Sequence, residues 1–489
     1  MHVSTYAIKT AQLSVGMVCK QEIEEKKTTM TDLIPHARSA GVRNPRLNMF
    51  KVPPTDLSMS SRRFVRINPF NTGINPVTFQ VDPQEDFIDL SESYFEVELT
   101  VKKDNNTNLL TADLIGIANN LAHTIFKQIN VRLNGTLISP QTDTYHLKAF
   151  IEAILNHDRD DGETLMTPEG WYNSLDVPDD GDADEYTANM LDTTHDDYKA
   201  LDNEHKALVN SRLQFLDGKK VTLRFKPYLE VFNLSKLLVP GVQIQIDMYF
   251  NSPDVWTIRW DGARTLRLTQ ADVNVRLVLA QVKVASVVDR EIQNDMKSGK
   301  VAAYPTVRGE IRTYSHPADN RHFECHNPFH NQVPNRLVMV LMDQATFNGA
   351  VDKNPFNFEK FNLTSVKQLI SGEEYPYETL ELQHDGDSKD QRGYYRFLQG
   401  SGALCRGKGN MVLKSNWGHG KRCNVFVFDN TANGCLDSPV LNPKQKGEVR
   451  LVIDFGANPG TNLTVLVYGE FENLMEINGN RVVTYDIYQ

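Results

Sequence analysis

Residues 94–102 read Tyr-Phe-Glu-Val-Glu-Leu-Thr-Val-Lys, and every second side chain from Phe95 to Val101 is apolar. Successive side chains of a strand point to opposite faces, so these residues would share one face and the polar residues the other. The alternation predicts a strand with a buried side and a hydrated side. It recurs at Val221–Phe225, Val242–Phe250, Val449–Phe455 and Leu463–Val467.

Three further segments refine the strand pattern. Asn134-Gly135 lies between apolar runs and predicts a tight hairpin, because both residue types tolerate positive φ. Leu337–Met342 is apolar throughout, as expected of a strand buried on both faces. In Ala271–Ala285 the apolar positions change from odd to even numbers, which predicts a β-bulge.

Helical spacing is rare in this chain. The best example is Asp143–His157, which Thr142 or Asp143 would cap, and the second is Val287–Ser298. Strand patterns far outnumber helical ones, so the predicted fold class is all-β with a few helical insertions.

The predicted organisation comprises an arm, two β domains and a linker. The arm is residues 1–48, the first domain 49–286, the linker helix 287–299 and the second domain 300–489. The first domain includes an insertion, 176–204, with eleven acidic residues and Lys199 as its only Lys or Arg. Such a charge run predicts a long hydrated loop.

The composition narrows the class of protein. A chain of 489 residues with 40% hydrophobic and 23% charged residues is typical of a globular protein. No apolar run is long enough for a membrane helix, and residues 1–27 do not read as a signal peptide. A net charge of −10 disfavours a general nucleic-acid coat, and the five cysteines form no CxxC pair.

No catalytic, cofactor or metal motif is convincing. His316, His322, Cys325, His326 and His330 lie close together, but their spacing fits a zinc site only in part, so a polar loop between strands is predicted. The Gly400–Gly409 stretch lacks a phosphate-binding pattern and is predicted to be a flexible loop. Enzymatic activity is therefore not expected.

Several ordered segments carry a resemblance to a known family. The most specific is Asp343–Asn357, reading Asp-Gln-Ala-Thr-Phe-Asn-Gly-Ala-Val-Asp-Lys-Asn-Pro-Phe-Asn. The others are Met49–Ser58, Asp86–Leu90, Tyr94–Val101, Asp143–Glu152, Leu234–Gly241, Tyr304–Arg308, Asn335–Val338 and Tyr468–Arg481. From about residue 49 onward the chain resembles the major capsid proteins of the Polinton/Maverick and adintovirus group.

The resemblance implies a double jelly roll, that is, two eight-stranded sandwiches side by side. It further implies homotrimers that act as pseudo-hexameric capsomers of an icosahedral shell around a DNA genome. The implied partners are further copies of the chain, penton and minor capsid proteins, and packaged DNA at the inner face. The implied location is the virion capsid, assembled in the host nucleus or cytoplasm.

Two charged regions are candidate sites within this scheme. The acidic insertion, with Asp179, Asp180, Asp182, Asp184 and Glu185, is a candidate for an outward-facing loop, and whether it binds calcium stays open. A basic group is a candidate for the capsid-interior base that meets the genome or an acidic tail; the alternative is that its members are ordinary strand and turn residues. This group is Arg43, Arg46, Arg62, Arg63 and Arg66.

Two other functions remain open from the sequence. One is a non-viral β-sandwich protein with a binding or adhesive role, and the other is a β-rich hydrolase with scattered carboxylates. A trimeric mass of the purified protein would favour the capsid interpretation, and a monomer would favour the others.

Overall fold

The computed structural model describes most of the chain. The described residues are 38–39, 44–50, 52–71, 73, 75–110, 113, 115–139, 143–173, 194–201, 206, 209–211, 214–259, 266–267, 272–382, 391–407, 409–434 and 441–485. Two compact units are distinguished, Met1–Leu57 and Ser58–Gln489, and each is described by itself. In the first, the 3-10 helix η1 (Pro45–Leu47) is the regular element found among the described residues.

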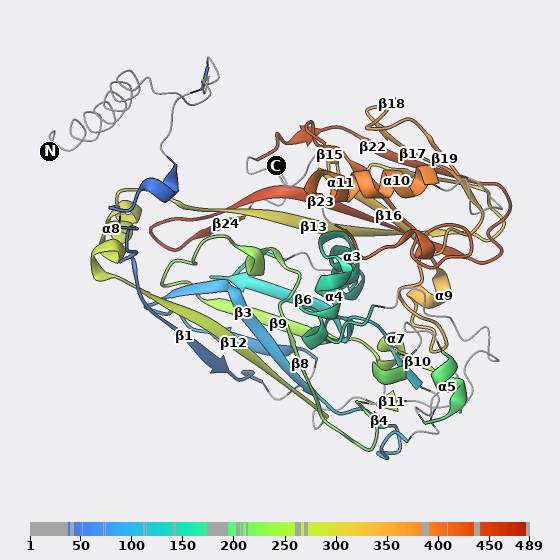
Figure 1. Ribbon diagram of the computed structural model, residues 1–489, viewed down its shortest axis with the longest axis horizontal. Coiled ribbons are helices and arrows are strands. Elements are labelled where there is room, and N and C mark those ends of the chain that lie inside the picture. The colour runs from blue at the N-terminus through green and yellow to red at the C-terminus, as the bar shows by residue number, and fades with distance from the viewer. Residues whose placement is uncertain are drawn as a thin grey trace, which may run out of the picture. The chain divides into compact units, whose positions relative to one another are not determined.

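Eight strands in the first half of the large unit form two antiparallel sheets (Figure 1). One sheet has the order β1-β12-β3-β8 and the other the order β2-β9-β6-β7. Their bounds are β1 (Met59–Ile67), β2 (Val77–Val81), β3 (Phe87–Leu99), β6 (Phe126–Leu133), β7 (Thr136–Leu137), β8 (Val221–Phe225), β9 (Ile244–Phe250) and β12 (Val273–Val284).

The pairing of these eight strands is nested. Counted along the chain, the first pairs with the eighth (β1 with β12), and the second with the seventh (β2 with β9). The third pairs with the sixth (β3 with β8), and the fourth with the fifth (β6 with β7). A long hairpin rolled into two facing sheets gives this order, which is the topology of a jelly roll.

The second half of the large unit repeats the nested order. β13 pairs with β23, β14 with β22, β16 with β20, and β17 with the short β18 and β19. The bounds are β13 (Ala302–His316), β14 (His322–His326), β16 (Arg336–Asp343), β17 (Leu363–Ile370), β18 (Glu373–Glu374), β19 (Leu380–Glu381), β20 (Val425–Asp429), β22 (Val449–Phe455) and β23 (Leu463–Ile477). The predicted fold class is confirmed: the chain is an all-β double jelly roll.

Short elements connect the sandwich strands. The minor strands are β4 (Lys102–Lys103), β5 (Ile115–Ile117), β10 (Thr257–Arg259), β11 (Leu266–Arg267), β15 (Gln332–Val333), β21 (Gln445–Lys446) and β24 (Val483–Tyr485). The helices are α2 (Leu121–Thr124), α3 (Tyr145–Asn156), α4 (Arg159–Glu163), η2 (Thr167–Glu169), α5 (Asp196–Ala200), η3 (Glu230–Asn233), α7 (Pro253–Trp256), α8 (Ser286–Lys297), α9 (Gln344–Phe347), α10 (Gln391–Gly400), α11 (Ala403–Arg406) and η6 (Lys414–Asn416).

Two hydrophobic cores fill the large unit, and each draws on both halves of the chain. The first core includes Tyr304 and Met475 besides the strands of the first sandwich. The second includes Phe150 and Ile154 of α3 besides the strands of the second sandwich. No sheet in the described residues combines strands from both sides of α8. The limits 1–48, 49–286, 287–299 and 300–489 stay a prediction.

Several local predictions are confirmed. Asn134 and Gly135 have φ of 47° and 84°, as the hairpin between β6 and β7 requires. The β12–β3 register shifts between Val278 and Ala280, where the change of apolar phase predicts a bulge. Seven of the eight residues of β16 are buried, and α8 follows the Val287–Ser298 pattern to within one residue.

Other local predictions are wrong. His322–His326 is not a loop but strand β14; Phe323 and Cys325 are buried while the flanking His322 and His326 face outward, so an alternation was overlooked. Part of the Gly-rich stretch is helix α11, whose ends at Gly402 and Gly407 are left-handed. The predicted loop 176–204 includes α5.

Details of capping and cysteine pairing also differ from expectation. Thr144 is the N-cap residue of α3 and makes no side-chain cap bond, so Asp143 is not the cap of this helix; Thr142 lies outside the described residues. Cys325 and Cys423 are buried and form no disulfide, whereas Cys405 is disulfide-bonded, a pairing that the odd cysteine count did not predict.

Candidate subunit interface

The outer face of the β1-β12-β3-β8 sheet, here called the β1 face, brings many charged residues together. Phe95, Val97 and Leu99 of β3 point into the core, so the residues between them point outward. The antiparallel register places the outward residues of β1, β12 and β8 beside them. The β1 face comprises Arg62, Phe64, Arg66, Tyr94, Glu96, Glu98, Arg224, Asn274 and Arg276.

Ion pairs link the charges of the β1 face. Glu96 lies 3.7 Å from Arg66 and 3.1 Å from Arg224, and its side chain is only 6% exposed. Glu98 accepts a hydrogen bond from Asn274 and pairs with Arg276 at 3.2 Å. The Asn274 bond, aided by Arg276, lowers the pKa of Glu98. The β1 face holds four arginines and two glutamates, so these pairs offset its positive charge only in part.

Aromatic rings are interleaved with these charges. Phe64 lies 6.4 Å from Tyr94, and the guanidinium of Arg62 lies 5.6 Å from the Phe64 ring centroid. Phe64 is 53% exposed, although a large apolar side chain gains free energy when it is buried. Aromatic and arginine side chains of this kind are enriched at the centres of protein–protein interfaces.

The edge of the sheet is open beside these residues. β1 is a terminal strand of the sheet, and its residues are exposed on nearly its whole length. An edge strand presents unpaired backbone groups to which another chain can add, and proteins usually cover or protect such edges. The β1 face and its edge are thus a candidate contact for another protein surface.

The structure places the predicted basic residues in different settings. Arg46 lies in η1, and Arg43 lies outside the described residues. Arg62 pairs with Asp89 at 3.0 Å, and Arg63 pairs with Asp86 at 3.1 Å. Like Arg66, both therefore have part of their charge neutralised. Their assignment to a capsid-interior base stays a prediction.

The predicted acidic residues cannot be placed. Asp179, Asp180, Asp182, Asp184 and Glu185 all lie outside the described residues. Their role as an outward-facing loop stays a prediction.

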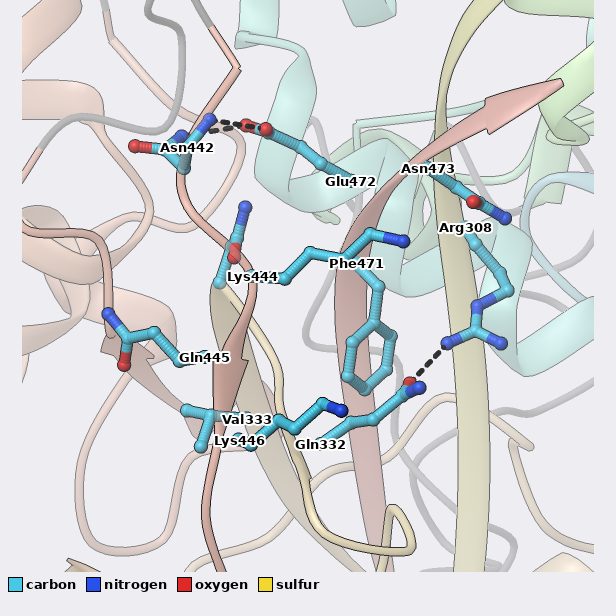
Figure 2. A pocket seen from close by; sticks show the side chains of 11 residues that line it. Arg308, Gln332, Val333, Asn442, Lys444, Gln445, Lys446, Phe471, Glu472 and Asn473 are labelled. Atoms are coloured by element: carbon cyan, nitrogen blue, oxygen red, sulfur yellow. Dashed lines mark hydrogen bonds between the residues drawn. The ribbon is translucent and has the colours of Figure 1, made fainter. Parts of the chain in front are cut away.

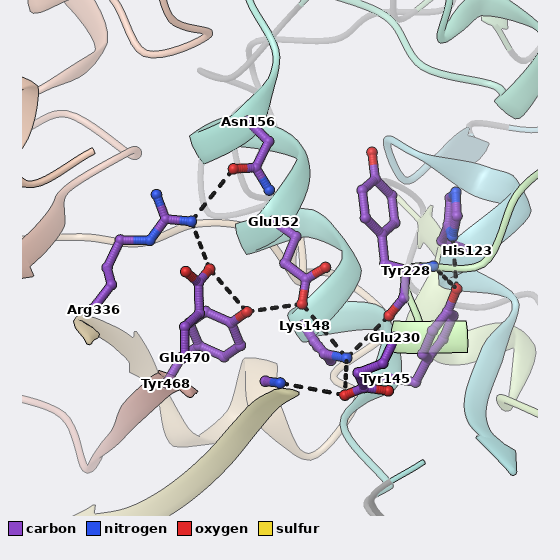
Figure 3. Close-up of polar contacts among 11 residues, drawn as sticks. His123, Tyr145, Lys148, Glu152, Asn156, Tyr228, Glu230, Arg336, Tyr468 and Glu470 are labelled. Atoms are coloured by element: carbon purple, nitrogen blue, oxygen red, sulfur yellow. Dashed lines mark hydrogen bonds and ion pairs between the residues drawn. The ribbon is translucent and has the colours of Figure 1, made fainter. Parts of the chain in front are cut away.

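Sequence reasoning missed a buried polar network between the two sandwiches (Figure 3). Lys148 of α3 lies 3.5 Å from Glu152 and 3.6 Å from Glu230, and its ammonium donates to the Tyr228 carbonyl. The Tyr468 hydroxyl of β23 donates to Glu152 at 2.8 Å. Helix α3 is thus tied to both sandwiches through polar contacts.

The network continues into the second sandwich. Arg336 donates to Glu470 at 2.6 Å, and both side chains are at most 5% exposed. The Arg336 guanidinium also donates to Asn156 at the end of α3. The sequence signal was present in Lys148, Glu152 and Asn156, polar residues spaced by four on an apolar helix, but the partners on β16 and β23 are remote in sequence.

Burial shifts the protonation of several of these groups. Burial raises the pKa of Glu152 to about 7, opposed by Lys148. Burial alone would lower the pKa of Lys148, but Glu152 and Glu230 together hold it above its usual value. Burial lowers the pKa of His146 to about 4, so that side chain is neutral near pH 7.

The histidines that lie close together in the sequence contact different partners in the structure. His322 lies 2.7 Å from Asp454, and His326 lies 3.1 Å from Glu324. His316 is buried and stacks on Phe455. Within the described ranges, no group of three or more His, Cys, Asp or Glu side chains has a geometry that could hold a metal ion.

Three solved structures of viral proteins have a fold similar to that of this chain. No protein-family model matches the chain. Over 90% of this chain and 99% of the other, the fold matches a chain of the PBCV-1 virus capsid with a TM-score of 0.55 and 11% identity. The Sputnik virophage structure matches over 94% of both chains with a TM-score of 0.56 and 9% identity.

A third solved structure and one curated relative extend the comparison. The mavirus major capsid protein matches over 94% of this chain and 97% of its own, with a TM-score of 0.52 and 12% identity. An uncharacterized protein of Caenorhabditis elegans is 20% identical over 405 residues, which are 80% of this chain and 88% of that protein. The chain has the fold of viral major capsid proteins. No helix among the described residues is both long and apolar enough to cross a membrane.

Proposed function

We propose that this protein is a viral major capsid protein without enzymatic activity. The observation that carries the proposal is the repeated nested pairing of two jelly rolls, in a fold that matches known capsid chains over 90% and 94% of this chain. A protein with this role works by association, so its surfaces rather than a reacting centre carry the function. The Polinton/Maverick and adintovirus group is the proposed origin, on the segments that resemble it.

The proposed assembly is a homotrimer. Each chain contains two jelly rolls, so a trimer contains six similar sandwiches. These six would form a pseudo-hexameric capsomer that can tile an icosahedral shell around DNA. Obligate contacts of this kind bury on the order of 2,000–5,000 Å². The β1 face, with its exposed Phe64 and open edge, is the proposed contribution of the first sandwich to these contacts.

Further partners follow from the same proposal. Penton and minor capsid proteins would complete the shell, and assembly would take place in the host nucleus or cytoplasm. Arg43, Arg46 and Arg63, the predicted basic residues that do not belong to the β1 face, would approach the packaged DNA or an acidic protein tail. The acidic insertion 176–204 would lie on the hydrated exterior.

Native mass in solution tests the trimer. We expect a species of three chains of 55.5 kDa, about 167 kDa, that persists on dilution. A monomer at every concentration would contradict the trimer and would favour a β-sandwich binding protein.

Charge reversal tests the interior role of the arginines. Replacement of Arg43, Arg46 and Arg63 by glutamate should leave particles that package less DNA, because the inner surface would repel phosphate. The measurement is the ratio of DNA to protein in purified particles. Particles with a full DNA content would refute the interior placement.

A further inference from the structure

Strand β23 passes from the second sandwich to the first (Figure 1). It pairs with β16 up to Glu470 and with β24 from Met475 onward. Met475, Ile477 and Val483 are at most 5% exposed and belong to the core of the first sandwich. We call residues 475–485 the C-terminal strap, because they complete a core that is otherwise built mainly from the first half of the chain.

The stretch that joins the strap to the second sandwich has few partners. Residues 471–474 pair with β13, and no second strand pairs with them within the part of the chain that the structure describes. A pocket of about 40 Å³ lies beside this stretch, and at its edge Asn442 donates to the Glu472 carboxylate at 2.6 and 2.7 Å (Figure 2). Because sparse backbone contacts lower the free energy of local opening, this stretch is the point about which the strap can hinge.

The side chain of Arg481 joins the strap to the first half of the chain. Its Nε donates to the Pro240 carbonyl at 2.5 Å, and its Nη2 donates to Gln293 of α8 at 2.8 Å. Its Nη1 lies 3.3 Å from the sulfur of Met296, also in α8. The Arg481 carbonyl accepts from the side chain of Asn134, in the β6–β7 hairpin, at 2.6 Å. One residue therefore contacts three separate segments of the first half.

The backbone of Arg481 indicates that these contacts, and not the turn, require an arginine. Its φ is 62°, in the left-handed region that is unfavourable for residues with a Cβ atom. Asn478 already closes the turn, since its carbonyl accepts from the Arg481 nitrogen at 2.9 Å and its side chain accepts from the Val482 nitrogen at 3.0 Å. Glycine would make the same turn with less strain. A strained residue persists where the surrounding structure holds it in place.

The strap fits closely against the segments that receive it. A Cβ atom at Gly479 would lie 2.6 Å from the Met296 carbonyl oxygen of α8. A Cβ atom at Gly241, beside Pro240, would lie 3.2 Å from Nε of Arg481. The two backbones thus approach as closely as packed elements do, so the strap is not a loosely attached tail.

We propose that the C-terminal strap closes the first sandwich, hinging at residues 471–474, and that Arg481 is the positioning residue that holds it closed. The strap opens and closes as one unit, because its two strand segments, in β23 and β24, pair with each other. Since β24 follows all the other strands in the sequence, the first sandwich closes only after every other strand has been synthesised. The proposal does not require that the protein form a trimer or a shell.

Hydrogen exchange of backbone amides in the full-length protein tests the proposal. Arg481→Gly removes the side-chain contacts and leaves the turn less strained. We expect amides of the strap to exchange at least about tenfold faster in this variant, while those of β17 and β22 in the second sandwich exchange as in wild type. Unchanged or slower exchange of the strap would show that Arg481 serves the turn alone and would overturn the proposal. So would equal acceleration in every strand, which would show a general loss of stability.

His330→Gly is the matched control. His330 also has a left-handed backbone, with φ of 52°, and is exposed. Among the residues that the structure describes, no side-chain hydrogen bond of His330 is found. The control therefore makes the same change to glycine, with the same gain of chain flexibility, away from the strap. The strap should exchange as in wild type in this variant, and acceleration equal to that in Arg481→Gly would contradict the role of Arg481.

Discussion

Glu152 is a carboxylic acid in the protein interior, between an ammonium group and a tyrosine hydroxyl. The pKa of this carboxyl is about 7 in the folded protein, whereas the ordinary value for glutamate is 4.5. Between pH 4.5 and pH 7 the folded state therefore holds a proton that the unfolded state has lost. The contribution of Glu152 to stability is therefore fully present below about pH 4.5 and is lost as pH rises through 7.

The Glu152→Gln variant tests this linkage. Glutamine stays neutral at every pH. Between about pH 5 and pH 8, the unfolding free energy of wild type should therefore fall by roughly 3 kcal/mol more than that of the variant. Chemical denaturation at both pH values measures the difference. The same change in both proteins would show that Glu152 does not titrate there.

The buried ion pair of Arg336 and Glu470 allows a second prediction, about the stability of variants that remove one or both charges. The Arg336→Met variant should lose about 3–5 kcal/mol of stability, because Glu470 would remain as a buried uncompensated charge. Adding Glu470→Gln should recover much of this loss. Denaturant unfolding of both variants is the measurement, and a double variant no more stable than the single one would contradict the charge argument.

The sequence shows these residues but not their partners. Lys148 and Glu152 are recognisable as polar positions on an apolar helix, because their spacing of four residues is local. Glu230 lies 82 positions from its partner Lys148, and Tyr468 lies 316 positions from its partner Glu152, so only the folded topology brings each pair together. Burial and pKa shifts depend on that topology and could not be derived from the pattern.

Helix α3 lies close to strand β13 at Gly309. A Cβ atom there would lie 2.7 Å from the Tyr468 ring and 2.8 Å from Cε of Lys148. We expect Gly309→Ala to destabilise the protein by about 1–3 kcal/mol, because the packed helix and strand must separate.

Gly409→Ala is the matched control. The nearest atom to its added methyl group would be 3.8 Å away, an ordinary contact. Thermal unfolding compares the two variants, and an equal effect of both would contradict the close approach of α3 to β13.

The exposed Phe64 of strand β1 allows a prediction about trimer formation. Phe64→Glu should weaken the trimer by at least tenfold in dissociation constant, while the stability of the single chain changes little because Phe64 is half-exposed. Leu165→Glu is the control, since Leu165 is similarly exposed but lies outside the β1 face. Sedimentation equilibrium measures both, and a trimer unaffected by Phe64→Glu would remove the β1 face from the interface.

Most strands were predictable, but their lateral partners were not. The alternation in β3, β9, β22 and β23 is strictly local, and so it could be read from the chain. Strand β14 was missed because histidines and a cysteine suggested metal chemistry and hid the alternation. The ion pairs of Arg62 and Arg66 depend on the β1–β12–β3 register, which the sequence does not specify.

Two jelly rolls of the same nested order form the whole large unit. The repetition is not visible as a sequence repeat, because a jelly roll needs only the order and polarity of its strands, and many sequences satisfy both. The repetition is visible once the strand pairings are known, and the solved capsid chains have a similar fold at identities of 9–12%.

Electron cryomicroscopy of the purified, assembled protein tests the central claim most directly. The capsid proposal predicts closed shells whose repeating units have a pseudo-hexagonal outline and contain three copies of this chain. Monodisperse single chains that form no such units under any assembly condition would contradict it.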